Sequence, residues 1–199
     1  MQSVREKIVF AAMQLFAEKG YGSTSVAEIL SKADVNAGSL YYVFPGKQDV
    51  LIAVLDAYLH GIEPMLLAPA WKGVADPIER VFALLAAYRK ALMSTGLTYG
   101  CPIGSIALEL HEPDPPVRKL LAKNFDGWVN AIEKCFADAG DRLPEDVDRR
   151  GLALLALTTM EGGVMVSRTD RKINAFDTAI AMFRDYIDRL QSQVAAHST

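Results

Sequence analysis

Residues 23–47 read STSVAEILSKADVNAGSLYYVFPGK, and their pattern is the most informative in the chain about its architecture. Ser25 and Glu28 have the spacing of a capping box, in which each side chain binds the backbone N–H of the other residue. This spacing predicts a short helix over 26–32. Asn36 is a good N-cap for a second short helix a few residues further on. Two short helices separated by a tight turn are typical of a helix-turn-helix.

Helical periodicity continues on both sides of this stretch, and no alternating strand pattern stands out. Before it, apolar residues recur at helical spacing over 3–19, and Gly20 suits the end of that helix. After it, a long helix is expected to run until Pro64. Further helices are expected at about 78–92, 103–110, 115–140, from Pro144, and at 176–194. The predicted fold class is all-α with about nine helices, divided into a three-helix helix-turn-helix domain (1–48) and a larger helical domain (49–199).

Composition limits the function classes. Of the 199 residues 51% are hydrophobic and 23% charged, so the chain can bury a sizeable core. The net charge of −3 excludes a uniformly basic nucleic-acid coat, although residues 1–48 carry five Lys and Arg against four Asp and Glu. Arg5, Glu6 and Lys7 interrupt the N-terminus before any hydrophobic run, and the uncharged stretch 91–108 contains Gly and Pro. We therefore expect a cytoplasmic protein without a membrane segment.

The second short helix has the residue types that a helix entering the major groove needs. Small residues at its start allow close approach of the backbone, while Asn, Ser and Tyr side chains can reach base edges or phosphates. Lys47 begins the next helix, whose N-terminal amides also favour a phosphate. The predicted DNA-binding residues here are Asn36, Ala37, Gly38, Ser39, Tyr41, Tyr42 and Lys47. The alternative is that both tyrosines are ordinary aromatic packing.

These residues resemble the DNA-binding domain of TetR-type (tetracycline repressor-like) transcriptional regulators. The resemblance is carried by TSVAEI at 24–29 and by VNAGSLYYVFPGK at 35–47, preceded by Phe16, Gly20 and Tyr21. It implies an all-helical homodimer with a DNA-binding head and a ligand-binding body. By position, it also implies that Thr24 and Ser25 touch phosphate, although Ser25 could equally serve only as a helix cap.

Irregular positions in the body indicate a small-molecule pocket. Glycines recur within 96–104. Gly162 and Gly163 lie inside a predicted helix, where each glycine lowers the stability by about 0.5–1 kcal/mol. The motifs GCPIG at 100–104 and EGGVMVSR at 161–168 resemble the C-terminal domain of the LmrA/YxaF-type subgroup, which implies a flat, largely apolar or aromatic effector. The predicted ligand-binding residues are Tyr88, Cys101, Ile103, Phe125, Trp128, Ile132, Thr159 and Glu161. Each aromatic could equally be core, and Glu161 could instead pair with Arg168.

The last two helices suit an interface between two copies of the chain. Apolar residues of the final helix recur with heptad spacing, which is typical of helices that pack along one seam. The predicted dimer-interface residues are Leu155, Gly163, Phe176, Ile180, Phe183, Ile187 and Leu190. They could equally form the interior core of one subunit, and the resemblance favours the homodimer.

No cofactor, metal or catalytic site is expected. Cys101 and Cys135 form no disulfide framework, and buried inert thiols are favoured over an oxidant sensor. Glu109, His111 and Glu112 do not share one helix face, so solvated surface is favoured over a metal site. The sequence also offers no nucleophile–base–acid set and no phosphate-binding glycine loop.

The features together predict a transcriptional regulator that responds to a ligand. We expect a repressor that binds a pseudo-palindromic operator in double-stranded DNA as a homodimer and is released by a small-molecule effector. The alternatives are a DNA-bound activator or an effector-independent regulator. An enzyme built on a helical bundle is the least favoured alternative.

Overall fold

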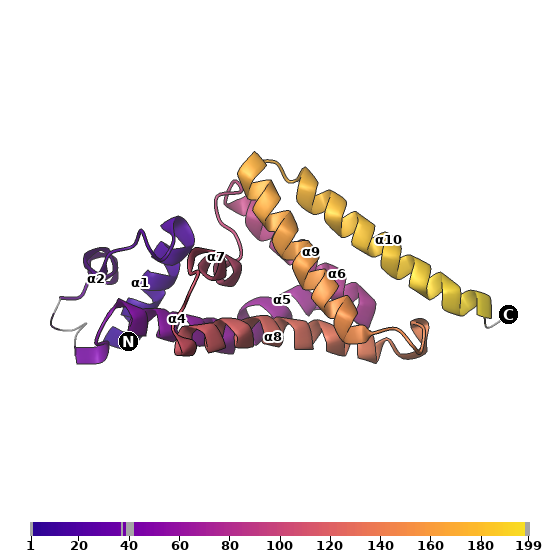
Figure 1. Ribbon diagram of the computed structural model, residues 1–199, viewed down its shortest axis with the longest axis horizontal. Coiled ribbons are helices and arrows are strands. Elements are labelled where there is room, and N and C mark those ends of the chain that lie inside the picture. Colours follow the sequence, from indigo (N-terminus) through magenta and orange to yellow (C-terminus); the bar gives the residue numbers. More distant parts are fainter. Residues whose placement is uncertain (1, 37, 39–41, 198–199) are drawn as a thin grey trace. The chain divides into compact units, whose positions relative to one another are not determined.

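The computed structural model describes residues 2–36, 38 and 42–197, and every regular element within them is helical (Figure 1). The prediction of an all-α fold is therefore confirmed. The helices are α1 (Val4–Lys19), α2 (Val26–Ala33), α4 (Lys47–Ile62), α5 (Ala68–Trp71), α6 (Pro77–Ser94), α7 (Pro102–Glu109), α8 (Pro115–Asp138), α9 (Arg149–Asp170) and α10 (Asn174–His197), with a π-helical turn at Glu63–Leu67 and a 3-10 turn at Gly140–Arg142.

The chain forms two compact units, and each is described by itself. The first unit comprises Met1–Gly61 and Cys101–Phe125, and the second comprises Ile62–Gly100 and Asp126–Thr199. The first unit thus contains α1, α2, most of α4, α7 and the beginning of α8. The second contains α6, α9, α10 and the remainder of α8.

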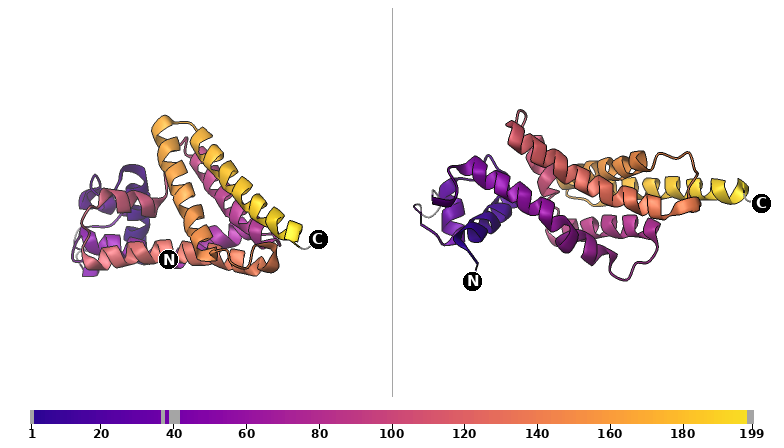
Figure 2. Two further views of the ribbon diagram at one scale, coloured as in Figure 1. Left: turned by 45° about the vertical axis from the view of Figure 1, so that its right-hand side comes forward. Right: turned by 90° about the horizontal axis from the view of Figure 1, so that it is seen from below.

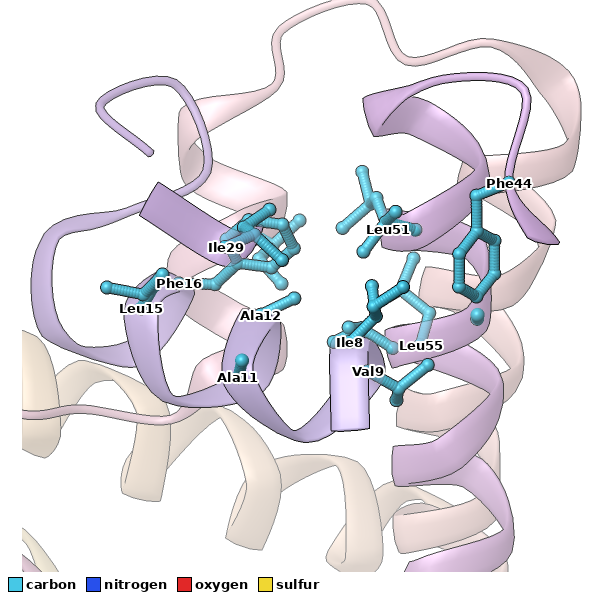
Figure 3. Close-up of a cluster of buried hydrophobic side chains, with 14 of the residues drawn as sticks. Ile8, Val9, Ala11, Ala12, Leu15, Phe16, Ile29, Phe44, Leu51 and Leu55 are labelled. Atoms are coloured by element: carbon cyan, nitrogen blue, oxygen red, sulfur yellow. The ribbon is translucent and has the colours of Figure 1, made fainter. Parts of the chain in front are cut away.

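The core of the first unit forms where α1, α2 and α4 face one another. Figure 3 shows their apolar side chains directed into a common interior, among them Ile8, Ile29 and Leu55, which are completely buried. Burying a side chain of this size contributes about 1.5–3 kcal/mol. Residues of α7 and of the start of α8 belong to the same cluster, including Ile106 and Leu121.

Caps at both ends fix the extent of the short helix α2. Ser25 and Glu28 form the predicted capping box, and Asp34 ends α2 in the left-handed conformation with φ 53°. A helix of eight residues is marginal on its own, so α2 depends on these caps and on the burial of Ile29.

The second unit is built on long helices. α9 and α10 form an antiparallel pair with α6 beside it, as Figures 1 and 2 show from different sides. At Gly163 of α9, an added Cβ would lie 3.1 Å from the Cα of Phe176, so glycine allows the close approach of the two helices there. The rings of Phe82 and Phe183 lie 5.7 Å apart between α6 and α10, and Arg89 pairs with Asp177 at 2.7 Å.

Two predicted helix boundaries are wrong. The helical run does not end at Pro64, because a π-helical turn accommodates the proline, which lacks an N–H, and the run continues to Trp71. Pro144 does not open a helix either. The helix α9 begins at Arg149, because the carboxylate of Asp148 accepts a hydrogen bond from the Gly151 N–H at 2.9 Å and caps it.

Among the described residues, the run Lys47–Trp71 has the length and the mean hydropathy, 1.6, of a membrane span. Its Val50, Val54 and Leu55 are completely buried in the core of the first unit. Core helices of globular proteins often have this length and composition, so the run is weak evidence for a membrane segment.

Candidate nucleic-acid interface

The turn that leads into α2 is held by side chains predicted to touch phosphate. Thr24 is only 1% exposed, and its hydroxyl donates a hydrogen bond to the carbonyl oxygen of Gly20 at 2.7 Å. The exposed Ser25 caps α2, because its Oγ accepts from the Glu28 N–H at 3.2 Å and donates to the Glu28 carboxylate at 2.7 Å. Both hydroxyls therefore have structural roles in the turn.

The described residues at both ends of the predicted second short helix lie at the surface. Asn36 and Gly38 are exposed, and Tyr42 is 94% exposed. Tyr42 therefore does not pack in the interior, whereas Phe44, two residues further on, is 3% exposed and belongs to the core. Ala37, Ser39 and Tyr41, also predicted to contact DNA, lie outside the described residues.

Lys47, the first residue of α4, lies over the turn between α1 and α2. Its Nζ is 4.2 Å from the centre of the Tyr21 ring and 3.5 Å from the carbonyl oxygen of Gly22. Desolvation lowers the pKa of Lys47, while the nearby carboxylates of Glu109 and Glu28 oppose that shift. The ammonium group is thus placed at the edge of the helix-turn-helix, next to the start of α2.

Two other cations of this region form ion pairs within the protein. Lys19 binds Glu28, and Lys32 lies 3.4 Å from Glu18. The bond from Lys19 and the cap from Ser25 lower the pKa of Glu28 to about 2. Two of the five cations in residues 1–48 are therefore partly neutralised, and helix N-termini must supply part of any attraction for phosphate.

Sequence reasoning missed one residue of this region, Glu109. Its carboxylate accepts hydrogen bonds from the backbone N–H groups of Tyr21, at 2.8 Å, and of Gly22, so it is not merely solvated surface as expected. Tyr21 and Glu109 are 88 positions apart, so no local pattern in the sequence reveals this contact. Within the described part of the chain no group of His, Cys, Asp and Glu is arranged to hold a metal ion.

The predicted ligand-binding residues are divided between the two units. Cys101 and Ile103 are buried in the core of the first unit, to which Phe125 is adjacent. Tyr88, Trp128, Ile132, Thr159 and Glu161 belong to the second unit. Cys101 and Cys135 are both buried and form no disulfide with each other, and burial raises the pKa of Cys135 to about 11, so the Cys135 thiol is poorly reactive.

Most of the predicted interface residues are buried within a single chain. Phe176, Phe183, Ile187 and Leu190 are at most 8% exposed, as expected for the interior-core alternative, and Ile180 is half-buried. Leu155 is 41% exposed. The structure adds exposed apolar side chains on α9 and α10 that heptad spacing did not reveal, namely Leu154, Met165, Val166, Met182 and Tyr186.

Family models match both parts of the chain. Residues 8–54 match the model of bacterial regulatory proteins of the tetR family, and residues 77–182 match the C-terminal domain of LmrA/YxaF-like transcriptional regulators. The chain therefore belongs to the TetR family of transcriptional regulators, in its LmrA/YxaF-like branch. Members of this family bind operator DNA, and the recognition made from residues 24–47 is confirmed.

Similar proteins span nearly the whole chain. The HTH-type transcriptional regulator Rv0196 of Mycobacterium tuberculosis is 29% identical over 192 residues, which cover 94% of this chain and 95% of that protein. The HTH-type transcriptional repressor DhaR of Mycobacterium sp. (strain GP1) is 26% identical over 176 residues, 87% of each chain. The crystal structure of the regulatory protein TetR from Rhodobacter sphaeroides superposes with a TM-score of 0.81 and 25% identity, covering 90% of this chain and 96% of the other. The protein is a DNA-binding transcriptional regulator and, as predicted, not an enzyme.

Proposed function

We propose that this regulator is a repressor that a small, largely apolar or aromatic effector releases from its operator. The head would be residues 1–48 and the ligand-binding and dimerisation body residues 49–199. The observation that carries the proposal is the contrast between exposed Tyr42 and buried Phe44 at the end of the helix-turn-helix. The name of the similar protein DhaR supports repression as the sign of regulation. A regulator of this kind acts in the cytoplasm, where bacterial DNA lies.

The proposed DNA contacts follow from exposure and charge. Asn36, Ala37, Gly38 and Ser39 would enter the major groove, which is about 12 Å wide and admits one helix. Tyr41, Tyr42 and Lys47 would contact the phosphates on either side of the groove. Thr24 and Ser25 would bring the N-terminal amides of α2 to a phosphate, since their hydroxyls already hold the turn and the cap.

A second copy of the chain is the proposed partner of α9 and α10. Leu154, Leu155, Met165 and Val166 are exposed on α9, and Met182 and Tyr186 on α10, so each of these two neighbouring helices exposes apolar side chains that a second copy could cover. Exposed apolar surfaces of this kind mark sites of protein association. A homodimer would also place two heads on operator half-sites about one helical turn, roughly 34–36 Å, apart.

The effector site is proposed from one buried donor. Trp128 is 3% exposed, and its indole N–H has no hydrogen-bond partner among the described residues. A buried donor without a partner costs about 1–3 kcal/mol, which an acceptor oxygen on a flat aromatic ligand would recover. Trp128 would then be the polar contact of a mostly apolar site that includes Ile132, which is completely buried.

The DNA contacts are tested with Tyr42→Ala and Lys47→Ala combined. Fluorescence anisotropy with a duplex selected from a random library by this protein is expected to show affinity reduced about 10- to 100-fold. The slope of log affinity against log salt should also decrease by about 2, because each protomer of a dimer loses one phosphate contact of Lys47. Lys72→Ala, which removes an exposed cation of the second unit, is the matched control. Unchanged operator affinity in the double variant would contradict the proposal.

The effector is sought with a panel of planar flavonoids. At least one compound is expected to raise the melting temperature and to release the duplex, and Trp128→Phe should weaken both effects while retaining an aromatic ring. A panel that changes neither property would favour the alternative of a regulator that needs no effector.

A further inference from the structure

The segment Cys101–Phe125 is attached to the DNA-binding head by polar side chains as well as by apolar packing. Besides the bonds of Glu109, the Gln48 side chain at the start of α4 donates to the carboxylate of Asp114 at 3.0 Å. Asn124 of α8, which is 7% exposed, donates to the carbonyl oxygen of Leu55 at 3.0 Å. All these contacts lie within the first unit.

Of these contacts, that of Glu109 bears directly on the helix-turn-helix. Its two carboxylate oxygens accept from two successive backbone N–H groups, those of Tyr21 and Gly22, and such charge-assisted bonds are about twice as strong as neutral ones. On the other side of the same turn, the Thr24 hydroxyl holds the carbonyl oxygen of Gly20. The turn is thus fixed at both ends immediately before the cap of α2, Ser25.

Glycine leaves the space that the carboxylate occupies. A Cβ built on Gly22 would lie 2.6 Å from an oxygen of Glu109, and one on Gly20 would lie 2.9 Å from the other oxygen. Gly20 also has a φ of 87°, whereas the backbone of Gly22 is one that alanine can adopt. A methyl group at position 22 therefore interferes with the carboxylate rather than with the backbone.

The same cluster contains the proposed phosphate-binding cation. The Nζ of Lys47 lies over the ring of Tyr21, whose backbone N–H binds Glu109, and close to the carbonyl oxygen of Gly22. Burial raises the pKa of the Tyr21 hydroxyl, with a smaller contribution from the charge of Glu109. Displacing the carboxylate would therefore alter both the start of α2 and the surroundings of Lys47.

We infer that Glu109 is a positioning residue for DNA binding, through which the C-terminal domain sets the turn between α1 and α2. Glu109 falls within the region 77–182 that matches the C-terminal family model, whereas Tyr21 and Gly22 fall within the region 8–54 that matches the DNA-binding model. The inference rests on the proposed function because the turn carries the proposed phosphate contacts.

The test breaks the contact from both sides, with Glu109→Gln and Gly22→Ala. Each variant is expected to lower affinity for the selected duplex about tenfold, which corresponds to ~1.4 kcal/mol. The double variant should bind no more weakly than the weaker single variant, because both changes remove the same interaction. Hydrogen exchange of the Tyr21 and Gly22 amides should become faster in each variant, while exchange in the core of α1 stays slow.

The control is Glu112→Gln, which removes the same charge from an exposed residue three positions away and should leave affinity and exchange unchanged. Parental affinity in either single variant, or losses that add in the double variant, would overturn the inference. If the parent protein bound no selected duplex, the proposed function would fail, and the exchange of the two amides would still decide the role of Glu109. A variant that unfolds as a whole is recognised by fast exchange in α1, and the other variant then decides.

Discussion

The two units of this protein are stabilised in different ways. In the first unit, α2 has eight residues and depends on a capping box, on the Thr24 hydroxyl and on the distant carboxylate of Glu109. In the second unit, α6, α9 and α10 have 18 to 24 residues and are held by apolar faces, with ion pairs such as Arg89–Asp177 at the rim. Both units therefore have an apolar core, and in the head polar contacts to the backbone also set the turn and the short helix, whereas in the body the packing of long helices is sufficient.

The largest expected effect comes from the packing of the second unit. Phe176→Ala removes a side chain that is 1% exposed and should lower the free energy of unfolding by ~3–5 kcal/mol in urea denaturation. Thr178→Ala, on the exposed side of the same helix, should change it by less than ~0.5 kcal/mol. Dissociation of a dimer by Phe176→Ala without loss of stability would instead place Phe176 at the interface.

Substitutions at the proposed dimer surface should dissociate the dimer without lowering the stability of the monomer. Leu155→Glu combined with Met182→Glu places charges on exposed positions, so the monomer should remain folded while the dimer dissociates in analytical ultracentrifugation. Loss of the second head should reduce operator affinity about 100-fold, or ~2.7 kcal/mol. Met65→Glu, at a residue that is 67% exposed but outside α9 and α10, should leave the dimer intact. A stable dimer in the double variant would refute this surface.

A smaller effect tests the polar contacts of the head. Thr24→Val keeps the shape of a buried side chain but leaves the carbonyl oxygen of Gly20 without its bond, at a cost of ~1 kcal/mol in thermal unfolding. Thr98→Val in the second unit removes a similar bond, to the carbonyl oxygen of Thr95, at an exposed site where water can replace it. The second variant should therefore cost less. Equal effects of the two substitutions would show that the Thr24 hydroxyl does not hold the turn.

The smallest expected effect is the pH dependence of the stability that Glu28 of the α2 capping box contributes. The folded pKa of Glu28 is about 2, below its ordinary value of 4.5, so its ionised carboxylate stabilises the head above pH 4.5. This contribution is lost as the pH falls from about 4.5 through about 2. The stability difference between the parent and Glu28→Gln should therefore shrink over that range in acid titrations followed by circular dichroism. Asp76→Asn is the matched variant of the second unit, because a hydrogen bond from Arg142 lowers the pKa of Asp76. A Glu28→Gln difference that is independent of pH would exclude an ionic role for the cap.

Features that depend on neighbouring residues were predicted correctly. The capping box of Ser25 and Glu28 and the helical start at Lys47 both appear in the structure. The wrong boundaries at Pro64 and Pro144 have a local cause as well. Pro64 lies in a π-helical turn, so the helical run continues past it. The carboxylate of Asp148 caps α9, so that helix begins after Asp148 and not at Pro144.

The all-helical fold, the helix-turn-helix and the family could be predicted from the amino-acid sequence, because caps, turns and helical periodicity depend on residues a few positions apart. The burial of Phe176, the exposure of Leu155 and Met182, and the bonds from Tyr21 and Gly22 to Glu109 could be learned only from the packed structure. A helix that carries two apolar stripes can bury either of them. Which of the two stripes is buried depends on how all the helices of a unit pack together. The same holds for the contact between Tyr21 and Glu109, which are 88 positions apart.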